Sequence, residues 1–298
     1  MKALAFVLCV CALLLSTFAL ASQPSLWAFN VGPGWDGQGL GLIICPDPFS
    51  TSPGAYPPGW NYLMDASYDV SRCLLYVSGG ITTPSPWTQH TIGIYAGGPG
   101  DLDYVSSSDT GMGGMNGYSW LGGIALLNES LYAVCYQDSR RTTVVLLRID
   151  DPGTAGQTVT QIGPLQGDMW SPGTPFNLCS DGQGSLFSVF RSWSSNESTL
   201  YRIDPGSASV TALHTYPDSL IDGWVEGLTL SGDSLYGVTT YGGQLIRFDL
   251  DTYEGTVMGV LWQSTLWTGL VTIPEPSAVG AVGLALVVGV LWRRARRR

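Results

Sequence analysis

The sequence predicts an all-β domain built from repeated units of four short strands. Apolar residues of the central chain fall in short alternating runs bounded by Gly, Pro, Asp and Ser, and no stretch there shows helical periodicity. Such runs are typical of many short strands. A second observation is that one strand motif recurs. Its copies are Ser130-Leu131-Tyr132-Ala133-Val134, Ser185-Leu186-Phe187-Ser188-Val189 and Ser234-Leu235-Tyr236-Gly237-Val238.

The spacing of this motif indicates the size of the repeating unit. Looser copies are Ser25-Leu26-Trp27-Ala28-Phe29 and Leu74-Leu75-Tyr76-Val77. The steps between the equivalent leucines are 49, 56, 55 and 49 residues, counted along Leu26, Leu75, Leu131, Leu186 and Leu235. A period of about 50 residues is the length of one four-stranded blade of a β-propeller.

Further strands are expected before and after each copy of the motif. A strand led by tryptophan precedes it, at Trp120, Trp170 and Trp224, with a looser version at Trp60. A third strand follows it and ends in an aspartate, at Asp150, Asp204 and Asp249. A turn and another short apolar run come next, so each unit has four strands. The recurring aspartate is expected to cap the turn.

The two ends of the repeat region complete one another. Trp267-Thr268-Gly269-Leu270-Val271 has the pattern of a first strand without a second, whereas Ser25-Leu26-Trp27 has that of a second strand without a first. Pairing of these strands would close a ring of five blades and hide the sheet edges. The repeats across residues 22–273 resemble those of secreted bacterial propellers of the NHL and YVTN kind. A β-sandwich or jelly roll is the alternative architecture.

The N-terminus has the pattern of a secretory signal peptide. Lys2 precedes an apolar run from Ala3 to Leu15, and Ala19 and Ala21 are the small residues that signal peptidase requires. We expect cleavage before Ser22, so that residues 1–21 are removed. A transmembrane anchor is the alternative, although the apolar run is shorter than the roughly 20 residues that cross a bilayer.

The C-terminus combines three elements in order. Pro274-Glu275-Pro276 ends the domain in an extended segment, because prolines are excluded from a helix interior. The uncharged run from Ala278 to Trp292 predicts a short transmembrane helix. A cytoplasmic basic anchor follows, made of Arg293, Arg294, Arg296, Arg297 and Arg298. By the positive-inside rule, residues 22–273 then lie outside the inner membrane.

Residues 274–298 resemble the PEP-CTERM sorting tag of exported bacterial proteins. The resemblance implies a Gram-negative host that makes an exopolysaccharide, and processing by a membrane exosortase at or near Pro274-Glu275-Pro276. It also implies an inner-membrane intermediate, followed by delivery to the cell surface or extracellular matrix. A plain single-span anchor without processing is the alternative.

The charge of the central chain argues against nucleic-acid binding. Without residues 1–21 and 274–298 there are 7 arginines, no lysine and 22 acidic residues, a net charge of 7 − 22 = −15. A surface of this sign repels phosphate groups and anionic lipid. We therefore expect no nucleic-acid partner.

The sequence lacks the motifs of common enzyme and metal sites. His90 and His214 are the only histidines, and there is no Cys-x-x-Cys, His-Glu-x-x-His or Gly-x-Ser-x-Gly pattern. No Walker or Rossmann glycine pattern lies between a strand and a helix. We accordingly expect no catalytic residue, metal site or cofactor. Export permits disulfides, so the remaining cysteines are either bridged or buried free thiols: Cys45, Cys73, Cys135 and Cys179.

Two features favour a binding surface. Trp35, Trp87 and Trp193 lie outside the repeated tryptophan position and are the candidate ligand contacts. Exposed aromatic rings of this kind suit a sugar ligand such as the host exopolysaccharide. The stretch from Gly97 to Gly117, rich in Gly, Ser, Asp and Met, is expected to be a long loop that could bind another surface protein.

Two functions of different classes follow. The first is a non-catalytic interaction or scaffold module of the cell surface or matrix, with exosortase and signal peptidase as partners during export. The second is an extracellular lyase or hydrolase that acts on polysaccharide, because propellers can gather side chains at one end of their channel. The lack of catalytic motifs favours the first. Titratable residues that converge at the channel mouth would favour the second.

Overall fold

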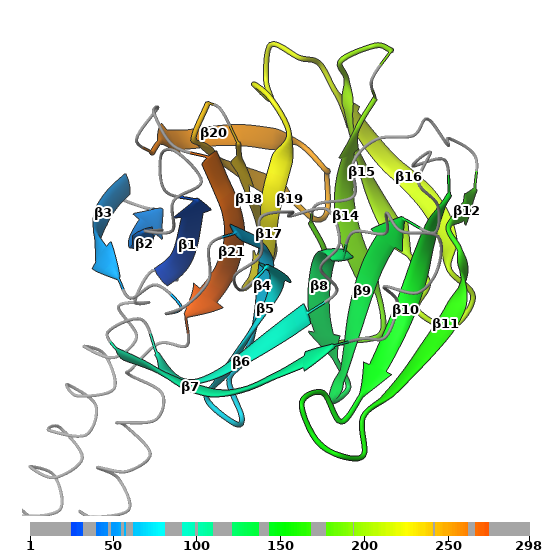
Figure 1. The fold of residues 1–298 in the computed structure, drawn as a ribbon. Coiled ribbons are helices and arrows are strands. Elements are labelled where there is room, and N and C mark those ends of the chain that lie inside the picture. Colours follow the sequence, from blue (N-terminus) through cyan, green and yellow to red (C-terminus); the bar gives the residue numbers. More distant parts are fainter. Residues whose placement is uncertain are drawn as a thin grey trace, which may run out of the picture.

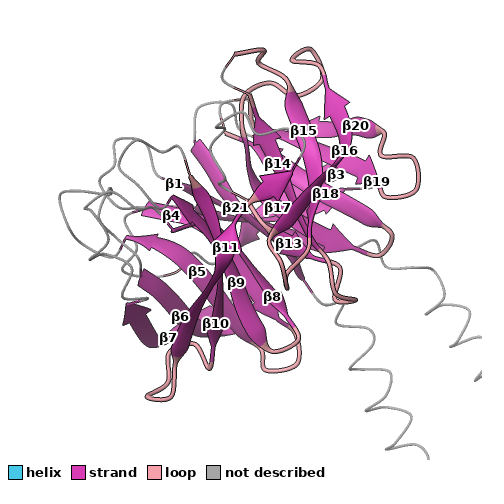
Figure 2. Ribbon diagram, turned by 90° about the vertical axis from the view of Figure 1, so that its right-hand side faces the viewer, coloured by secondary structure: helices cyan, strands magenta, loops and turns pink. Residues whose placement is uncertain are grey.

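The described part of the protein consists of β-strands and the turns between them. The computed structural model describes residues 25–31, 40–46, 49–54, 57, 62–80, 91–98, 101–109, 121–136, 143–167, 177–192, 194–240, 242–261 and 266–273. Within these ranges the strands form five sheets. The sheets stand as five blades around a common axis (Figure 1, Figure 2). The all-β class and the five-bladed propeller are therefore confirmed.

Each blade is given from its innermost to its outermost strand. Blade 1 contains β21 (Leu266–Ile273), β1 (Ser25–Val31), β2 (Leu40–Pro46) and β3 (Phe49–Gly54). Blade 2 contains β4 (Tyr62–Asp69), β5 (Leu74–Gly80), β6 (Thr91–Gly98) and β7 (Asp101–Asp109). Blade 3 contains β8 (Leu121–Leu127), β9 (Ser130–Tyr136), β10 (Val144–Asp150) and β11 (Thr158–Pro164).

The last two blades follow the same order. Blade 4 contains β13 (Cys179–Ser180), β14 (Leu186–Arg191), β15 (Ser198–Ile203) and β16 (Ser209–Tyr216), with β12 (Gln166–Gly167) at its outer edge. Blade 5 contains β17 (Val225–Ser231), β18 (Ser234–Thr239), β19 (Gln244–Asp249) and β20 (Gly255–Val260).

The recurring sequence motif forms the second strand of every blade. Its five copies coincide with β1, β5, β9, β14 and β18. The two ends of the domain meet in blade 1, where Ser25 pairs with Ile273 and Trp27 pairs with Val271. Figure 1 shows this junction as the dark blue β1 beside the orange β21. Closure of the ring by its terminal strands is confirmed, and it pairs the edges of β1 and β21 that an open array would expose.

Two parts of the chain differ from the sequence prediction. The stretch from Gly97 to Gly117, expected to be one long loop, contains β7, a strand of 9 residues. Its Asp and Ser residues concealed the strand, because an exposed outermost strand needs no apolar alternation. Blade 4 has a first strand of only 2 residues. It also has an additional strand, because β12 pairs parallel with β16.

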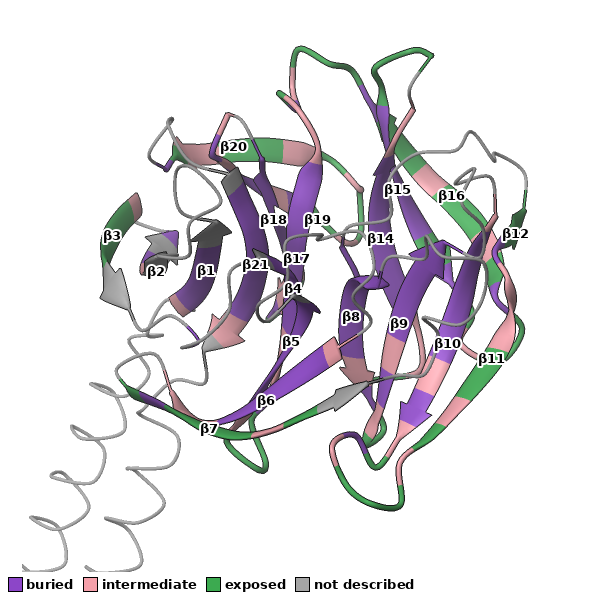
Figure 3. Ribbon diagram, viewed as in Figure 1, coloured by how far each residue is buried: buried purple, intermediate pink, exposed green. Residues whose placement is uncertain are grey.

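The core lies between neighbouring blades. Five clusters of buried apolar side chains each join two adjacent blades. Burial decreases from the inner to the outer strands, as Figure 3 shows for β7, β11, β16 and β20. Trp27 and Trp267 are the largest of the fully buried side chains, and they lie in the two clusters that flank blade 1. Burial of this apolar surface stabilises the closed ring.

The propeller has two faces with different connections. One face carries the turns that join first to second strands and third to fourth strands, such as residues 70–73 and 204–208. Ile273 ends a first strand and Ser25 begins a second strand, so both ends of the domain leave from this face, named the exit face. At the opposite face, named the far face, the second strands end and the third strands begin.

Candidate functional site

The first strands of the five blades surround the central channel and approach one another closely at one level. Alignment of the repeats places five residues at this level: Asp65, Gly123, Asn177, Gly227 and Gly269. A Cβ atom on Gly123 would lie 2.2 Å from the backbone carbonyl carbon of Asn177. One on Gly227 would lie 2.6 Å from the backbone nitrogen of Leu270. Neighbouring strands therefore meet backbone to backbone, and a side chain does not fit at these glycines.

Asp65 occupies this level of the channel. Its side chain is fully buried. Oδ2 accepts hydrogen bonds from the backbone N–H groups of Ile124 (2.9 Å) and Leu178 (3.1 Å). One carboxyl thus joins blade 2 to the inner segments of blades 3 and 4. Its other oxygen, Oδ1, has no hydrogen-bond partner among the described residues.

Asn177 makes a comparable link between blades 4 and 5. Its Nδ2 donates to the backbone carbonyl groups of Val189 (2.9 Å) and Val225 (2.6 Å). Its Oδ1 accepts from the N–H of Val189 at 2.8 Å. Because both ends of the buried amide are bonded to backbone, Asn177 serves the structure of the ring.

A second carboxyl, Glu226 on β17, is buried next to the glycine of blade 5. Its exposed fraction is 8%. Burial raises the pKa of Glu226 to about 8. A hydrogen bond with the side chain of Thr240 acts in the opposite direction, but its effect is smaller. Burial also raises the pKa of Asp65 well above its usual range, and the charge of Glu226 raises it further. Glu226 is therefore mainly protonated at neutral pH, and burial disfavours the charged form of Asp65.

These buried acids are not arranged for glycoside hydrolysis. That reaction needs two carboxyls that face each other across a sugar. Asp65 instead bonds to the backbone of the strands that enclose it. The sequence-based reasoning missed Asp65, Asn177 and Glu226. For Asp65 and Asn177, the usable signal was their position in the repeat, where the other blades have glycine.

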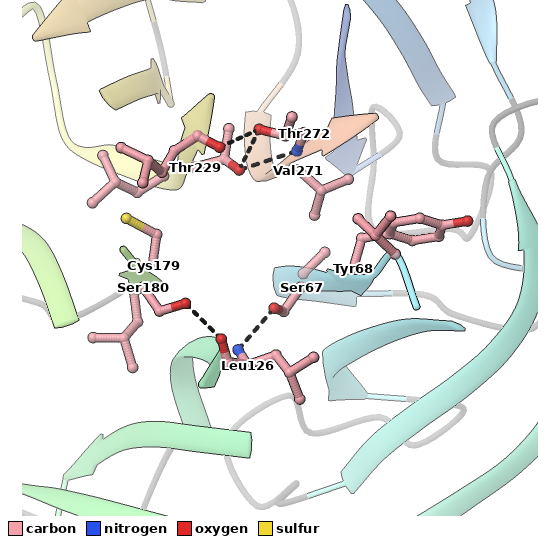
Figure 4. A pocket seen from close by; sticks show the side chains of 13 residues that line it. Ser67, Tyr68, Leu126, Cys179, Ser180, Thr229, Val271 and Thr272 are labelled. Atoms are coloured by element: carbon pink, nitrogen blue, oxygen red, sulfur yellow. Dashed lines mark hydrogen bonds between the residues drawn. The ribbon is translucent and has the colours of Figure 1, made fainter. Parts of the chain in front are cut away.

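A pocket lies along the first strands, on the exit-face side of the aligned level. Figure 4 shows the side chains that line it. The cavity volume is about 230 Å³. Its walls are the residues that follow the aligned level in the first strands, among them Ser67, Leu126, Ser180, Thr229 and Thr272. Their position toward the ends of the first strands explains why the pocket opens on the face where the domain ends leave.

Hydroxyl groups in the pocket join the first strands of neighbouring blades. Ser67 Oγ accepts from the N–H of Leu126 at 3.0 Å, and Ser180 Oγ donates to the carbonyl oxygen of Leu126 at 2.5 Å. On the other side of the pocket, Thr272 N–H donates to Thr229 Oγ1 at 3.0 Å. These hydroxyls satisfy backbone groups that have no ladder partner, so they are part of the scaffold.

The chemistry of the pocket suits a small neutral group. No Asp, Glu, Lys, Arg or His is among its lining residues. Burial raises the pKa of both the Tyr68 hydroxyl and the Cys179 thiol, which keeps both groups neutral. A charged ligand would lose its hydration without gaining an ionic partner. The volume is also smaller than the roughly 300–1,000 Å³ of typical small-molecule pockets.

The candidate ligand contacts Trp35, Trp87 and Trp193 lie outside the described residues. Each belongs to the connection from the second to the third strand of its blade. The described strand ends that bound these three connections lie on the far face. The pocket therefore opens at the opposite end of the channel from those strand ends.

The predicted signal cleavage site, Pro-Glu-Pro motif and C-terminal arginines also lie outside the described residues. Among the residues that are described, no helix is long and apolar enough to cross a bilayer. In the same part of the chain, no group of three or more His, Cys, Asp or Glu side chains is placed to hold a metal ion.

Three of the four cysteines in the domain are free thiols. Cys135 and Cys179 are buried, whereas Cys73 is exposed. Burial raises the pKa of Cys135 to about 12, so this thiol is unreactive at neutral pH. Of the two alternatives for Cys135 and Cys179, a disulfide or a buried free thiol, the structure shows the second. The side chain of Cys45 lies outside the described residues.

The recurring aspartates have structural roles. Asp204 Oδ1 accepts from the N–H groups of Gly206 and Ser207, and Asp249 Oδ1 accepts from those of Asp251 and Thr252. The expected turn caps are therefore confirmed at these two positions. Asp150 instead accepts from the Ser130 hydroxyl at 2.6 Å and from the Arg148 guanidinium.

No family model matches the chain, and no curated protein matches it in sequence. Among solved structures, a chain of a nidogen/laminin complex is 13% identical with a TM-score of 0.49, over 84% of this chain and 97% of that chain. A Bacteroides fragilis protein, provisionally named a 6-phosphogluconolactonase, is 9% identical with a TM-score of 0.48, over 85% of this chain and 99% of that chain. Neither similarity bears on the function of this chain.

Proposed function

We propose that this chain is an exported protein of the bacterial cell surface or extracellular matrix. Its propeller serves as a non-catalytic interaction or scaffold module, and its tail directs sorting. The observation that carries the proposal is the pairing of Ser25 with Ile273. The predicted signal cleavage site precedes Ser25 by only three residues, and the Pro-Glu-Pro motif begins directly after Ile273.

Processing at either end is compatible with the closed ring. Both predicted cleavage sites lie outside the strands of blade 1, so their removal takes away no paired residue. Both chain ends leave the domain on the exit face, which turns that face toward the membrane while the tail is inserted. The far face then points outward, toward exopolysaccharide or another surface protein.

The described channel supports a scaffold role over the polysaccharide lyase or hydrolase considered from the sequence. An enzyme of that kind needs accessible titratable groups at the channel mouth. At the described exit-face mouth, the titratable groups are Tyr68 and Cys179, and burial raises the pKa of both. The buried carboxyls of Asp65 and Glu226 lie deeper and belong to the scaffold.

Mass spectrometry of the mature chain from the producing bacterium tests the sorting proposal. We expect a mature N-terminus at Ser22, loss of the segment that follows Pro-Glu-Pro, and recovery in the surface or matrix fraction. An intact tail in the inner membrane would contradict exosortase processing and identify a plain anchored domain.

A variant pair makes this test specific. Glu275→Ala changes the motif and should hold the chain in the inner membrane. Glu254→Ala removes an exposed acid from a turn on the same face and should be sorted normally. Equal retention of both variants would show that the motif has no special role.

A further inference from the structure

The exit-face pocket has two unlike sides. Figure 4 shows Ser67 and Ser180 beside Leu126 at one side, and Thr229 and Thr272 at the other. The first group comes from blades 2, 4 and 3, and the second from blades 5 and 1. The hydrogen bonds already made on each side decide what that side can offer to a ligand.

On the first side, two serines have unused hydrogen-bonding capacity. A hydroxyl group can donate one hydrogen bond and accept two. Ser67 Oγ accepts from the N–H of Leu126, and its own hydrogen has no acceptor among the described residues. Ser180 Oγ donates to the carbonyl oxygen of Leu126, and no described residue donates to it. This side therefore offers one donor and one acceptor, each held in place by a bond to backbone.

On the second side, the hydroxyl hydrogens are already used. Thr272 Oγ1 donates to the carbonyl oxygen of Leu230 at 2.6 Å. The hydrogen in the 3.0 Å bond between the two threonine hydroxyls therefore comes from Thr229. Leu228, Leu230 and Val271 add aliphatic carbon atoms to the lining. This side is accordingly the less polar of the two.

The rest of the lining adds an aromatic ring and no fixed charge. Tyr68 contributes its ring, because its hydroxyl donates to the carbonyl oxygen of Gly97 at 2.9 Å. No Asp, Glu, Lys, Arg or His lines the pocket. A cavity of about 230 Å³ admits one small ring, since pockets for larger ligands start at roughly 300 Å³. A matching ligand combines hydroxyl groups, C–H groups and no net charge.

We propose that the exit-face pocket binds one neutral sugar ring. Its hydroxyl groups accept from Ser67 and donate to Ser180, and its C–H groups pack against Leu230 and Val271. A sugar hydroxyl suits both serines because it donates and accepts, whereas an anion only accepts and an ammonium group only donates. The inference deepens the interaction role proposed above by naming a ligand class, and it does not depend on the sorting tail.

Saturation-transfer NMR of the full-length chain, in a detergent without a sugar head group, tests the proposal. The probes are the methyl glycosides of glucose, galactose and mannose, with methyl glucuronide and glucosamine as charged counterparts. We expect transfer to at least one neutral glycoside and much less to the charged sugars, because the pocket has no ionic partner to replace their lost hydration. Transfer to no neutral glycoside would overturn the proposal, and so would equal transfer to the charged sugars.

A neutral trisaccharide shows whether the site also accepts the end of a chain. Because the cavity admits one ring, saturation should be concentrated on the terminal ring, with a Kd close to that of the monosaccharide. Equal saturation of all three rings would contradict a one-ring pocket.

Serine variants locate the binding. Ser67→Ala and Ser180→Ala each remove one hydrogen bond to the ligand and should raise its Kd by about twofold to tenfold. The matched control is Ser188→Ala. The Ser188 hydroxyl also donates to a backbone carbonyl group, that of Asn177 at 2.6 Å, but it lies outside the pocket, so this variant should keep the Kd of the unaltered chain.

The same Kd in both pocket variants and in the control would place the sugar elsewhere and overturn the proposal. Thermal unfolding shows whether each variant is folded at the temperature of the titration. The comparison of neutral with charged sugars uses the unaltered chain, so it decides the question even if a serine variant does not fold. Failure of sorting in cells leaves all of these measurements unchanged.

Discussion

Single polar side chains hold the inner ring of the propeller together where the strands leave no room for water. Asp65 accepts N–H groups from blades 3 and 4. The amide of Asn177 bonds to carbonyl groups within blade 4 and on blade 5. At the same repeat position the other blades have glycine, and a Cβ atom at Gly123 or Gly227 would collide with the backbone of the neighbouring blade. Asp65 and Asn177 thereby satisfy buried backbone groups, which an apolar side chain would leave without a partner.

Removal of the Asp65 carboxyl should destabilise the whole ring. Asp65→Ala leaves the N–H groups of Ile124 and Leu178 buried without an acceptor. Each such group costs about 1–3 kcal/mol, so we expect a loss of about 2–6 kcal/mol in the free energy of unfolding. Asp65→Asn keeps a neutral acceptor of the same shape and should lose much less. Urea unfolding followed by tryptophan fluorescence measures both, and equal stability of the two variants would contradict the role of this carboxyl.

The stability of the domain should fall as the pH rises. Burial raises the pKa of Glu226 from 4.5 to about 8, so across this interval the folded state keeps a proton that the unfolded state has released. Each pKa unit corresponds to about 1.4 kcal/mol, and the expected loss is on the order of a few kcal/mol. Asp65 contributes in the same direction. In Glu226→Gln the decrease in the free energy of unfolding with pH should be smaller. Urea unfolding at pH 5 and pH 8 measures this decrease in both proteins. The same pH dependence in both would count against a buried neutral Glu226.

At the scale of elements, the first strand of each blade has the most constrained packing. Its alternating pattern was visible in the sequence for blades 3 and 5. In these blades a tryptophan is followed closely by Gly-Ile-Ala-Leu or Gly-Leu-Thr-Leu. β13 was less visible, because 2 residues are too few for a periodic pattern. β7 was mistaken for a loop, because its exposed Asp and Ser residues carry turn signals. Apolar inner strands of ordinary length are therefore predictable from local pattern, whereas a very short strand and a polar edge strand are not.

Gly123→Ala should destabilise the protein although alanine is a small residue. Its Cβ atom would lie 2.2 Å from the backbone carbonyl carbon of Asn177, and that backbone cannot move without separating blades 3 and 4. Overpacking against a rigid neighbour costs about 1–3 kcal/mol or more. Gly98→Ala is the matched control, because no atom lies within 4 Å of its added Cβ. Thermal unfolding of both variants should show a decrease in Tm for Gly123→Ala alone.

For the whole molecule, closure through blade 1 connects the ends of the domain. β1 pairs with β21 on one side and with β2 on the other. The clusters on both sides of blade 1 each contain residues of β1 and β21. Loss of either strand would open the ring and expose both clusters at once.

Two truncations separate the ring from its tail. A mature chain that begins after Val31 lacks β1 and should lose cooperative unfolding, because β21 and β2 then have no common partner. A chain that ends at Ile273 keeps every strand and should unfold at the same Tm as the full-length protein. Calorimetry measures both, and a cooperative transition in the first variant would show that blade 1 is dispensable.

The sequence by itself determined the all-β class, the repeat of about 50 residues and the closure of five blades. The class and the repeat follow from local alternation and its recurrence along the chain, and closure follows because the two end segments each supply a strand that the other lacks. Only the tertiary structure decided that Asp65 and Glu226 are buried acids, that a neutral pocket lies between Asp65 and the exit face, and that Tyr104 and Val105 are half exposed. These features depend on contacts between blades separated by tens of residues. In the sequence Asp65 is one acid among 23, and only the strands of blades 3 and 4 exclude water from it.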